Sequence, residues 1–258
     1  MSRPRNHRKR ITGLGAAGLV LVLAAVSGCG HEGTSVGDGR PGGAATAEAT
    51  ATAEATATKD SIVHASDRPG KSVNITIDDG PSPEWTPQFL QVLKDNEVKA
   101  TFCMIGPSAQ AHADLVKKVV AAGHRLCDHT VAHDEAMSKK PESYQAHQIL
   151  DAEKMIKSAA GGAPVSYYRA PGGDFDAYSR KTAAGHGMRP LGWNVDSHDW
   201  QRLGTDRIVR SVKAQLTPAK PTVLLHDGGG DRSQSLAALQ QLLPWMKQQG
   251  YGFGFPKH

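Results

Sequence analysis

Two short segments of the sequence combine residues that could hold a metal ion and activate water. Asp78 and Asp79 end an alternating apolar run, Val73, Ile75 and Ile77, and a Gly-Pro pair follows them. Alternation of this kind is typical of a strand, and Gly-Pro is a stop signal. The two carboxylates are therefore predicted to lie where a strand meets a turn.

The second segment contains two histidines, His129 and His133, four residues apart. This spacing lets both imidazoles face one ion, and one carboxylate would complete a three-ligand set with open positions. A catalytic metal needs open positions, whereas a structural site closes with a fourth ligand. The remaining carboxylate would stand beside the metal as a candidate base. Taken alone, each segment is a weak signal of a metal site. Asp-Asp-Gly-Pro, for example, is commonly a turn with a helix cap.

The composition limits the class of protein. The chain has 258 residues, 39% hydrophobic and 21% charged, which suits one globular domain of roughly 200 residues with additional segments. The formal charge of +5 arises in residues 1–28, which hold five basic residues and no acid, so the rest has 30 − 5 = 25 basic residues against 25 acidic ones. A near-neutral chain gives no support to nucleic-acid binding.

The N-terminus has the features of an export signal. A basic head precedes an apolar stretch, residues 16–26, that is shorter than the roughly 20 residues of a membrane span. Val26-Ser27-Gly28-Cys29 resembles a bacterial lipobox, which implies cleavage before Cys29 and a lipid on its sulfur, so that residues 1–28 are a signal peptide. The alternative is an ordinary secretory signal. Under the first interpretation the protein is lipid-anchored to the outer face of the bacterial cell membrane, in the cell-wall space.

A tether is predicted after Cys29. Residues 30–60 contain no aromatic residue and repeat Thr-Ala-Glu-Ala-Thr-Ala at 46–51 and 52–57. Such a composition buries too little apolar surface to offset chain entropy. We expect residues 29–68 to be a disordered linker and residues 69–258 to form the folded domain.

Short apolar runs alternate with amphipathic ones in the folded domain, which predicts an α/β architecture with parallel strands and covering helices. Strands are predicted at 73–77, 100–104, 125–127, 166–168, 190–194, 222–225 and 251–253. Helices are predicted at 86–96, 113–122, 142–160, 178–187, 205–216 and 235–249. Seven strands in under 190 residues suit a distorted or incomplete (β/α)7 barrel.

Polar clusters follow five of these strands, and in parallel barrels the functional site forms at that end of the strands. These clusters are found in order at 76–81 (TIDDGP), 129–133 (HTVAH), 169–173 (RAPGG), 196–200 (DSHDW) and 224–227 (LLHD). As a set they resemble the five motifs of the polysaccharide deacetylase family, with the NodB homology domain, also called carbohydrate esterase family 4. The resemblance covers about residues 71–253.

The resemblance implies a role for each matching residue. Asp79, His129 and His133 would bind one divalent metal, most commonly Zn²⁺, with Co²⁺ or another ion as alternatives. Asp78 would be the general base and His226 the general acid. The remaining assignments are as follows: Arg169 orients Asp78, Asp196 orients His226, the backbone N–H of Gly172 holds the oxyanion, and Trp200 and Leu225 wall the acetyl pocket.

Two features depart from or add to this pattern. Gly172 stands where the family often has an aromatic residue, so one wall of the substrate groove could be absent. Lipidation of Cys29 would leave Cys103 and Cys127 as an even pair outside the cytoplasm, and either a disulfide or two buried thiols fits the sequence.

The family resemblance implies an acetylated polysaccharide as partner, and the anchor and tether favour peptidoglycan as the substrate of an N-deacetylase. Chitooligosaccharides and acetyl xylan are alternatives because the same site chemistry serves all three. A non-catalytic carbohydrate-binding surface lipoprotein is the alternative from another class, and a structural zinc protein would need a fourth ligand that is not evident. We expect the protein to be a monomer.

Overall fold

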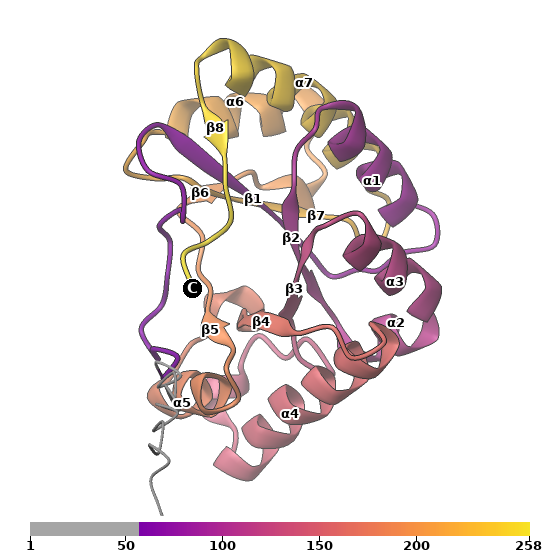
Figure 1. Ribbon diagram of the computed structural model, residues 1–258, viewed down its shortest axis with the longest axis vertical. Coiled ribbons are helices and arrows are strands. Elements are labelled where there is room, and N and C mark those ends of the chain that lie inside the picture. Colours follow the sequence, from indigo (N-terminus) through magenta and orange to yellow (C-terminus); the bar gives the residue numbers. More distant parts are fainter. Residues whose placement is uncertain (1–56) are drawn as a thin grey trace, which may run out of the picture. The chain divides into compact units, whose positions relative to one another are not determined.

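The computed structural model describes residues 57–258, so the predicted signal peptide, Cys29 and most of the predicted linker lie outside the described residues. The described part is built on one curled, parallel β-sheet with helices around its outside (Figure 1). The strands are β1 (Ser72–Asp78), β2 (Ala100–Met104), β3 (Arg125–Asp128), β4 (Val165–Tyr168), β5 (Arg189–Pro190), β6 (Val195–Asp196), β7 (Thr222–His226) and β8 (Gly252–Phe253).

The strand order is β5-β4-β3-β2-β1-β7-β6, and β8 pairs with the start of β1. The two ends of this order, β5 and β6, pair only with β4 and β7 respectively, so the curled sheet is an incomplete barrel. The predicted distorted α/β barrel is thereby confirmed. The number of strands was wrong by one: the predicted strand at 190–194 is instead β5 and β6, because the chain leaves β4 there and crosses to β7.

Seven α-helices occur in the described residues, at Thr86–Asp95 (α1), Gly106–Ala111 (α2), Ala113–Ala121 (α3), Glu142–Ala159 (α4), Ala177–Gly185 (α5), Thr205–Gln215 (α6) and Ser233–Gln248 (α7). Short 3₁₀ helices lie at Met137–Lys139 (η1), Pro171–Gly173 (η2) and Asp199–Gln201 (η3). All six predicted helices are present with ends shifted by three residues or fewer, and α2 was not predicted. Among residues 57–258, no helix is both long and apolar enough to cross a bilayer.

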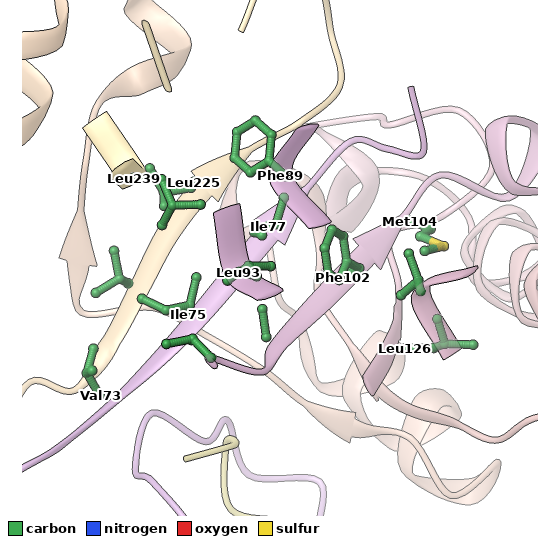
Figure 2. Close-up of a cluster of buried hydrophobic side chains, with 14 of the residues drawn as sticks. Val73, Ile75, Ile77, Phe89, Leu93, Phe102, Met104, Leu126, Leu225 and Leu239 are labelled. Carbon is green, nitrogen blue, oxygen red and sulfur yellow. The ribbon is translucent and has the colours of Figure 1, made fainter. Parts of the chain in front are cut away.

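The main hydrophobic core lies between the sheet and these helices. Helices place apolar side chains at three- and four-residue spacing on one stripe; in α1 this stripe includes Phe89 and Leu93. They pack in one buried cluster with Ile75 and Ile77 of β1 and Leu225 of β7 (Figure 2). This apolar contact holds the helices onto the strands, whose carboxyl ends form the site.

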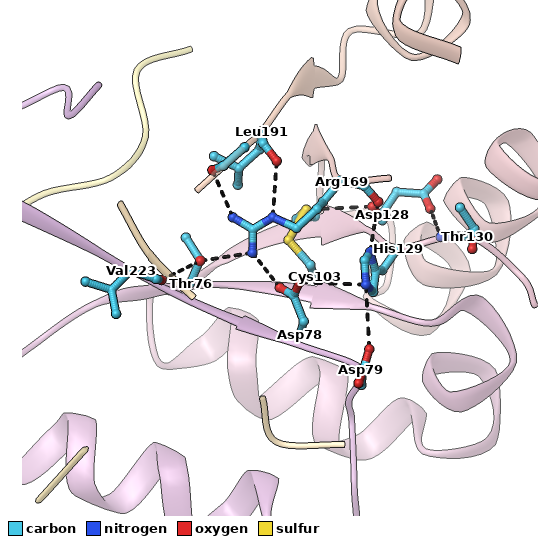
Figure 3. Close-up of a disulfide and its surroundings, with 12 residues drawn as sticks. Thr76, Asp78, Asp79, Cys103, Asp128, His129, Thr130, Arg169, Leu191 and Val223 are labelled. Atoms are coloured by element: carbon cyan, nitrogen blue, oxygen red, sulfur yellow. Dashed lines mark hydrogen bonds and ion pairs between the residues drawn. A yellow bond between two sulfur atoms is a disulfide. The ribbon is translucent and has the colours of Figure 1, made fainter. Parts of the chain in front are cut away.

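A second, smaller cluster fills the inside of the curled sheet. Cys103 and Cys127, aligned on β2 and β3, form a disulfide there, which resolves the alternative that the sequence left open. Tyr167, Leu191 and Val63 complete the cluster. The disulfide cross-links β2 and β3 beside Arg169 (Figure 3).

Val63 belongs to a segment that we predicted to be disordered. Residues 61–67 instead pack on the domain: Val63 pairs with Leu191, and Ser66 with Pro256. The predicted domain start at residue 69 is therefore too late. The prediction failed because the composition around Val63 is polar. The burial of the Val63 side chain and the backbone hydrogen bonds of this segment depend on residues that are distant in the sequence.

Candidate active site

The carboxylate pair lies at the carboxyl end of β1, as predicted. Asp78 is the last residue of the strand and its side chain is almost fully buried. Asp79 follows with a positive φ of 74°, and its backbone N–H donates to the Cys103 carbonyl on β2 (3.1 Å). The sharp turn between the two residues directs the adjacent carboxylates to different partners.

His129 and His133 come from the loop after β3. Two residues of that loop, Thr130 and His133, have positive φ values of 68° and 51°. The Asp128 carboxylate accepts a hydrogen bond from the Thr130 N–H (2.7 Å), and Thr130 Oγ1 accepts one from the His133 N–H (3.2 Å). These short-range bonds hold the tight loop that brings both imidazoles towards Asp79. Figure 3 shows His129 beside Asp79.

The three predicted metal ligands converge. Nε2 of His129 and of His133 lie 3.6 and 3.3 Å from Asp79 Oδ1, and one donor atom from each of the three residues lies within 4.8 Å of the others. Asp79 Oδ1 is buried without a hydrogen-bond partner in the structure, which costs free energy unless an additional group meets it.

His129 Nδ1 faces the Arg169 carbonyl at 2.8 Å, so Nε2 is free to act as a ligand. Burial lowers the pKa of His129 to about 3, which favours the neutral, ligating form. These residues fit a divalent metal.

Arg169 holds the carboxylate that is not part of this set. Its guanidinium is fully buried, and Nη1 donates to Asp78 Oδ1 at 2.6 Å and to Thr76 Oγ1 at 3.0 Å. Burial raises the pKa of the Asp78 carboxyl, and the Arg169 charge opposes that rise. Asp78 Oδ2 lies 3.7 Å from His129 Nε2, so the candidate base is beside the proposed metal position, as the sequence predicted.

The partner of His226 differs from the prediction. Asp199, and not Asp196, contacts this imidazole: Nδ1 lies 2.7 Å from Asp199 Oδ1, and the His226 N–H donates to Oδ2 at 2.9 Å. Asp196 instead accepts from the His198 N–H. Burial lowers the pKa of His226, but the Asp199 carboxylate outweighs this and raises it to about 9. Both acids belong to the same five-residue motif, and only the 3₁₀ turn at η3 decides which one faces His226.

A cavity of about 370 Å³ opens over these residues. It is lined by the following side chains and backbone: Asp78, Asp79, His129, His133, Glu135, Gly172, Trp193, Asp196, Trp200, Leu224 and His226. Among the described residues, the lining includes every predicted site residue except Arg169, which contacts Asp78, and Leu225. Leu225 is buried in the outer core, because side chains alternate along β7, and its neighbour Leu224 lines the cavity in its place.

Two lining residues were not predicted. Trp193 packs against Gly173 and over the Arg169 guanidinium, whose central carbon lies 5.6 Å from the ring centre. Glu135 lies beside Gly172, where a side chain at residue 172 would otherwise project. Trp193 lies in the predicted strand at 190–194, and a tryptophan near the end of a strand was the available signal for it. Nothing in the local sequence marked Glu135.

A cavity with a buried Asp-His-His set, a carboxylate fixed by an arginine and a protonated imidazole fixed by an aspartate is the equipment of a metal-dependent hydrolase. Comparisons with known proteins define the class more closely. The model of the family described as "Polysaccharide deacetylase" matches residues 65–191.

Individual relatives agree with the family match. The chain is 39% identical to a peptidoglycan-N-acetylglucosamine deacetylase of Bacillus cereus, over 71% of this chain and 85% of the relative. It is 36% identical to a chitooligosaccharide deacetylase of Sinorhizobium fredii, over 70% and 87%. The crystal structure of the Bc1960 peptidoglycan N-acetylglucosamine deacetylase superposes with a TM-score of 0.69 at 31% identity, covering 75% of this chain and 89% of that one.

The chain therefore belongs to the polysaccharide deacetylase family, carbohydrate esterase family 4. It is a hydrolase that removes acetyl groups from acetylated polysaccharide, and the predicted family and activity are confirmed.

Proposed function

We propose that this protein is a zinc-dependent N-deacetylase of peptidoglycan, anchored by a lipid on Cys29 and held in the cell wall by the segment that follows. The observation that carries the enzymatic part is the meeting, in one cavity, of the Asp79–His129–His133 set with two separately oriented proton-transfer groups, Asp78 and His226. The 39% identical relative with a peptidoglycan substrate in its name supports the choice of polymer.

Asp79, His129 and His133 would hold the metal ion. When bound, such an ion lowers the pKa of a water molecule and polarises the acetyl carbonyl. The one-carboxylate, two-imidazole set suits Zn²⁺. The Gly172 backbone lines the same cavity and is the candidate donor to the oxyanion.

Asp78 is assigned the role of general base. Burial raises the pKa of its carboxyl, which makes it a better proton acceptor than an exposed aspartate. The hydrogen bond from Arg169 keeps one carboxylate oxygen occupied, so the second oxygen, which lies on the side of His129, is the one available to take a proton.

His226 is assigned the role of general acid. A pKa of about 9 keeps the imidazole protonated at neutral pH, and Asp199 fixes Nδ1, so Nε2 is the atom that can donate. An amine leaving group has to be protonated as the C–N bond breaks. A group that carries its proton at neutral pH is suited to amide hydrolysis.

Acetate release from a panel of substrates tests the function. Peptidoglycan, chitin oligomers and acetylated xylan should be compared at equal acetyl content, with and without a chelator and with Zn²⁺ restored. We expect release from peptidoglycan that chelator abolishes and zinc restores. Greater activity on chitin oligomers would favour the second candidate, which the Sinorhizobium fredii relative supports. Absence of metal-dependent release from every acetylated glycan would overturn the catalytic assignment.

The anchor has its own test. The full chain and its Cys29→Ala variant should be expressed with a clickable fatty acid, followed by separation of membrane and medium. We expect label and membrane retention only for the unchanged chain. Label on both forms, or on neither, would show that Cys29 is not the lipidated residue.

A further inference from the structure

The Arg169 guanidinium is held from two opposite sides. On one side it contacts Asp78 and Thr76, as described above. On the other, Nε donates to the Leu191 carbonyl at 3.1 Å and Nη2 to the Gly192 carbonyl at 3.2 Å. Because the side chain is fully buried, no solvent can replace a lost acceptor. The two carbonyl oxygens therefore fix the guanidinium together with Asp78 and Thr76.

These carbonyls lie in the gap between β5 and β6, where the sheet is open. Residues 63 and 64, near the start of the described part of the chain, hold this stretch in place of a neighbouring strand. The Val63 N–H donates to the Pro190 carbonyl at 2.8 Å, and the Gly192 N–H donates to the Val63 carbonyl at 3.0 Å. The His64 carbonyl accepts from Thr222 Oγ1 on β7 at 2.6 Å. The segment thus joins the stretch that follows β5, at one end of the open sheet, to β7, the last strand but one at the other end.

Side chains of the same segment close tightly on Gly192. A Cβ atom at residue 192 would collide with His64 Nε2 and lie only 2.8 Å from Ile62 Cγ2. Between these two residues, Val63 points into the inner cluster with Leu191 and the disulfide. The Gly192 backbone is therefore confined both by hydrogen bonds and by side-chain contact, and glycine is the residue that permits this close approach.

We propose that residues 62–64 are a positioning element of the catalytic centre, which sets the Leu191 and Gly192 carbonyls that fix Arg169 and, through it, the Asp78 carboxylate. The proposal rests on the deacetylase function, with Asp78 as the base. It gives a catalytic purpose to a segment that lies before residue 65, where the family match begins.

Gly192→Ala in the full chain is the direct test, and Gly254→Ala is the matched control. A Cβ at residue 254 would meet Ser66, Asp67 and Arg68 at similarly short distances, so it disturbs the same N-terminal segment away from Arg169. We expect Gly192→Ala to lower kcat about 10- to 100-fold with little change in KM, because a misplacement of about 1 Å in a catalytic group can cost about 100-fold. Gly254→Ala should keep the kcat of the unchanged protein even if its Tm falls as much as that of Gly192→Ala.

Rescue separates positioning from general damage. Ile62→Ala/His64→Ala removes only side-chain atoms, and we expect it to fold and to lower kcat several-fold by loosening Gly192. Adding Gly192→Ala to this pair refills the space, so the triple variant should be more active than the single Gly192→Ala variant. Equal loss of kcat in Gly192→Ala and Gly254→Ala, or no recovery in the triple variant, would overturn the proposal.

A second measurement does not depend on activity. Hydrogen exchange of the Arg169 Nε–H, followed by NMR in the metal-free protein, should be slow in the unchanged chain because this group is buried and donates to Leu191. We expect faster exchange in Gly192→Ala and in Ile62→Ala/His64→Ala, and no change in Gly254→Ala. Unchanged exchange in the first two would overturn the proposal. Absence of acetate release by the unchanged protein would instead count against the function itself.

Discussion

The outer and inner faces of the curled sheet differ in what fills them, and β1 shows the contrast along a single strand. Val73, Ile75 and Ile77 face the helices in an apolar core (Figure 2). The intervening Asn74 and Thr76 face inward, as buried as their apolar neighbours, and lead up to Asp78. One face is held by non-directional apolar packing, and the other by hydrogen bonds that fix the position of individual atoms.

Asn74 and Thr76 each make a specific hydrogen bond to β7 from the inner face of β1. Asn74 Nδ2 donates to Thr222 Oγ1 at 2.9 Å, and Thr76 Oγ1 donates to the Val223 carbonyl at 2.6 Å while accepting from Arg169. Buried polar groups are stable only when such partners exist. We therefore expect the outer face to supply most of the stability and the inner face to hold the groups of the candidate active site in position. Four predictions test this division.

The largest effect is expected for Asp78→Asn, at the top of the inner face. Loss of the base should lower kcat about 1,000-fold, within the usual range for general-base catalysis. Zinc affinity, measured by calorimetry, should be nearly unchanged because Asp79, His129 and His133 remain. Retention of most activity would show that the base is a different residue.

Ile75→Ala tests the outer face. Its side chain is almost fully buried in the apolar cluster, and truncation should cost about 3 kcal/mol of unfolding free energy, measured by urea denaturation. Under native conditions kcat should stay within about two-fold of the unchanged protein, since outer packing does not contact the guanidinium or the carboxylates. A large loss of kcat in the folded variant would contradict the division between the two faces.

Thr76→Val, one residue further along the strand, should show the opposite pattern. The substitution removes an acceptor of Arg169 and a donor to Val223, which should cost about 1–2 kcal/mol. We expect kcat to fall several-fold with KM unchanged, because Arg169 loses one of its supports. If kcat followed stability in the same way as in Ile75→Ala, the inner face would have no separate role.

The smallest effect is a shift in pH dependence. His226 has a pKa raised to about 9 by Asp199, so it holds its proton below that pH and loses it as the pH rises through about 9. Activity should therefore fall on the alkaline side near pH 9. Asp199→Asn removes the main cause of the raised pKa and should move this limb down by about 1–3 units, whereas Asp196→Asn should leave it in place. A shift in Asp196→Asn and none in Asp199→Asn would restore the original assignment.

Much of the site could be predicted because the chemistry lies in short motifs next to strand ends. Asp78, Asp79, His129, His133, Arg169 and His226 all reach one cavity or its wall, and parallel strands bring such residues to a common edge. The misassigned residues share a cause. Asp196 was predicted to contact His226, where Asp199 does, and Leu225 was predicted to line the cavity, where Leu224 does. The first choice depends on a 3₁₀ turn and the second on the alternation of side chains along β7. Motif spacing encodes neither.

From the sequence alone, the motif resemblance was sufficient to identify the family, and local periodicity was sufficient to predict the parallel α/β class. The folded structure was needed to establish the pairing of Cys103 with Cys127, the partner of His226 and the position of residues 62–64. Each depends on which distant segments become neighbours when the sheet curls and stays open between β5 and β6. Val63 shows the physical reason: its hydrogen bonds and buried side chain exist only once β4 and β5 have placed Leu191 beside it.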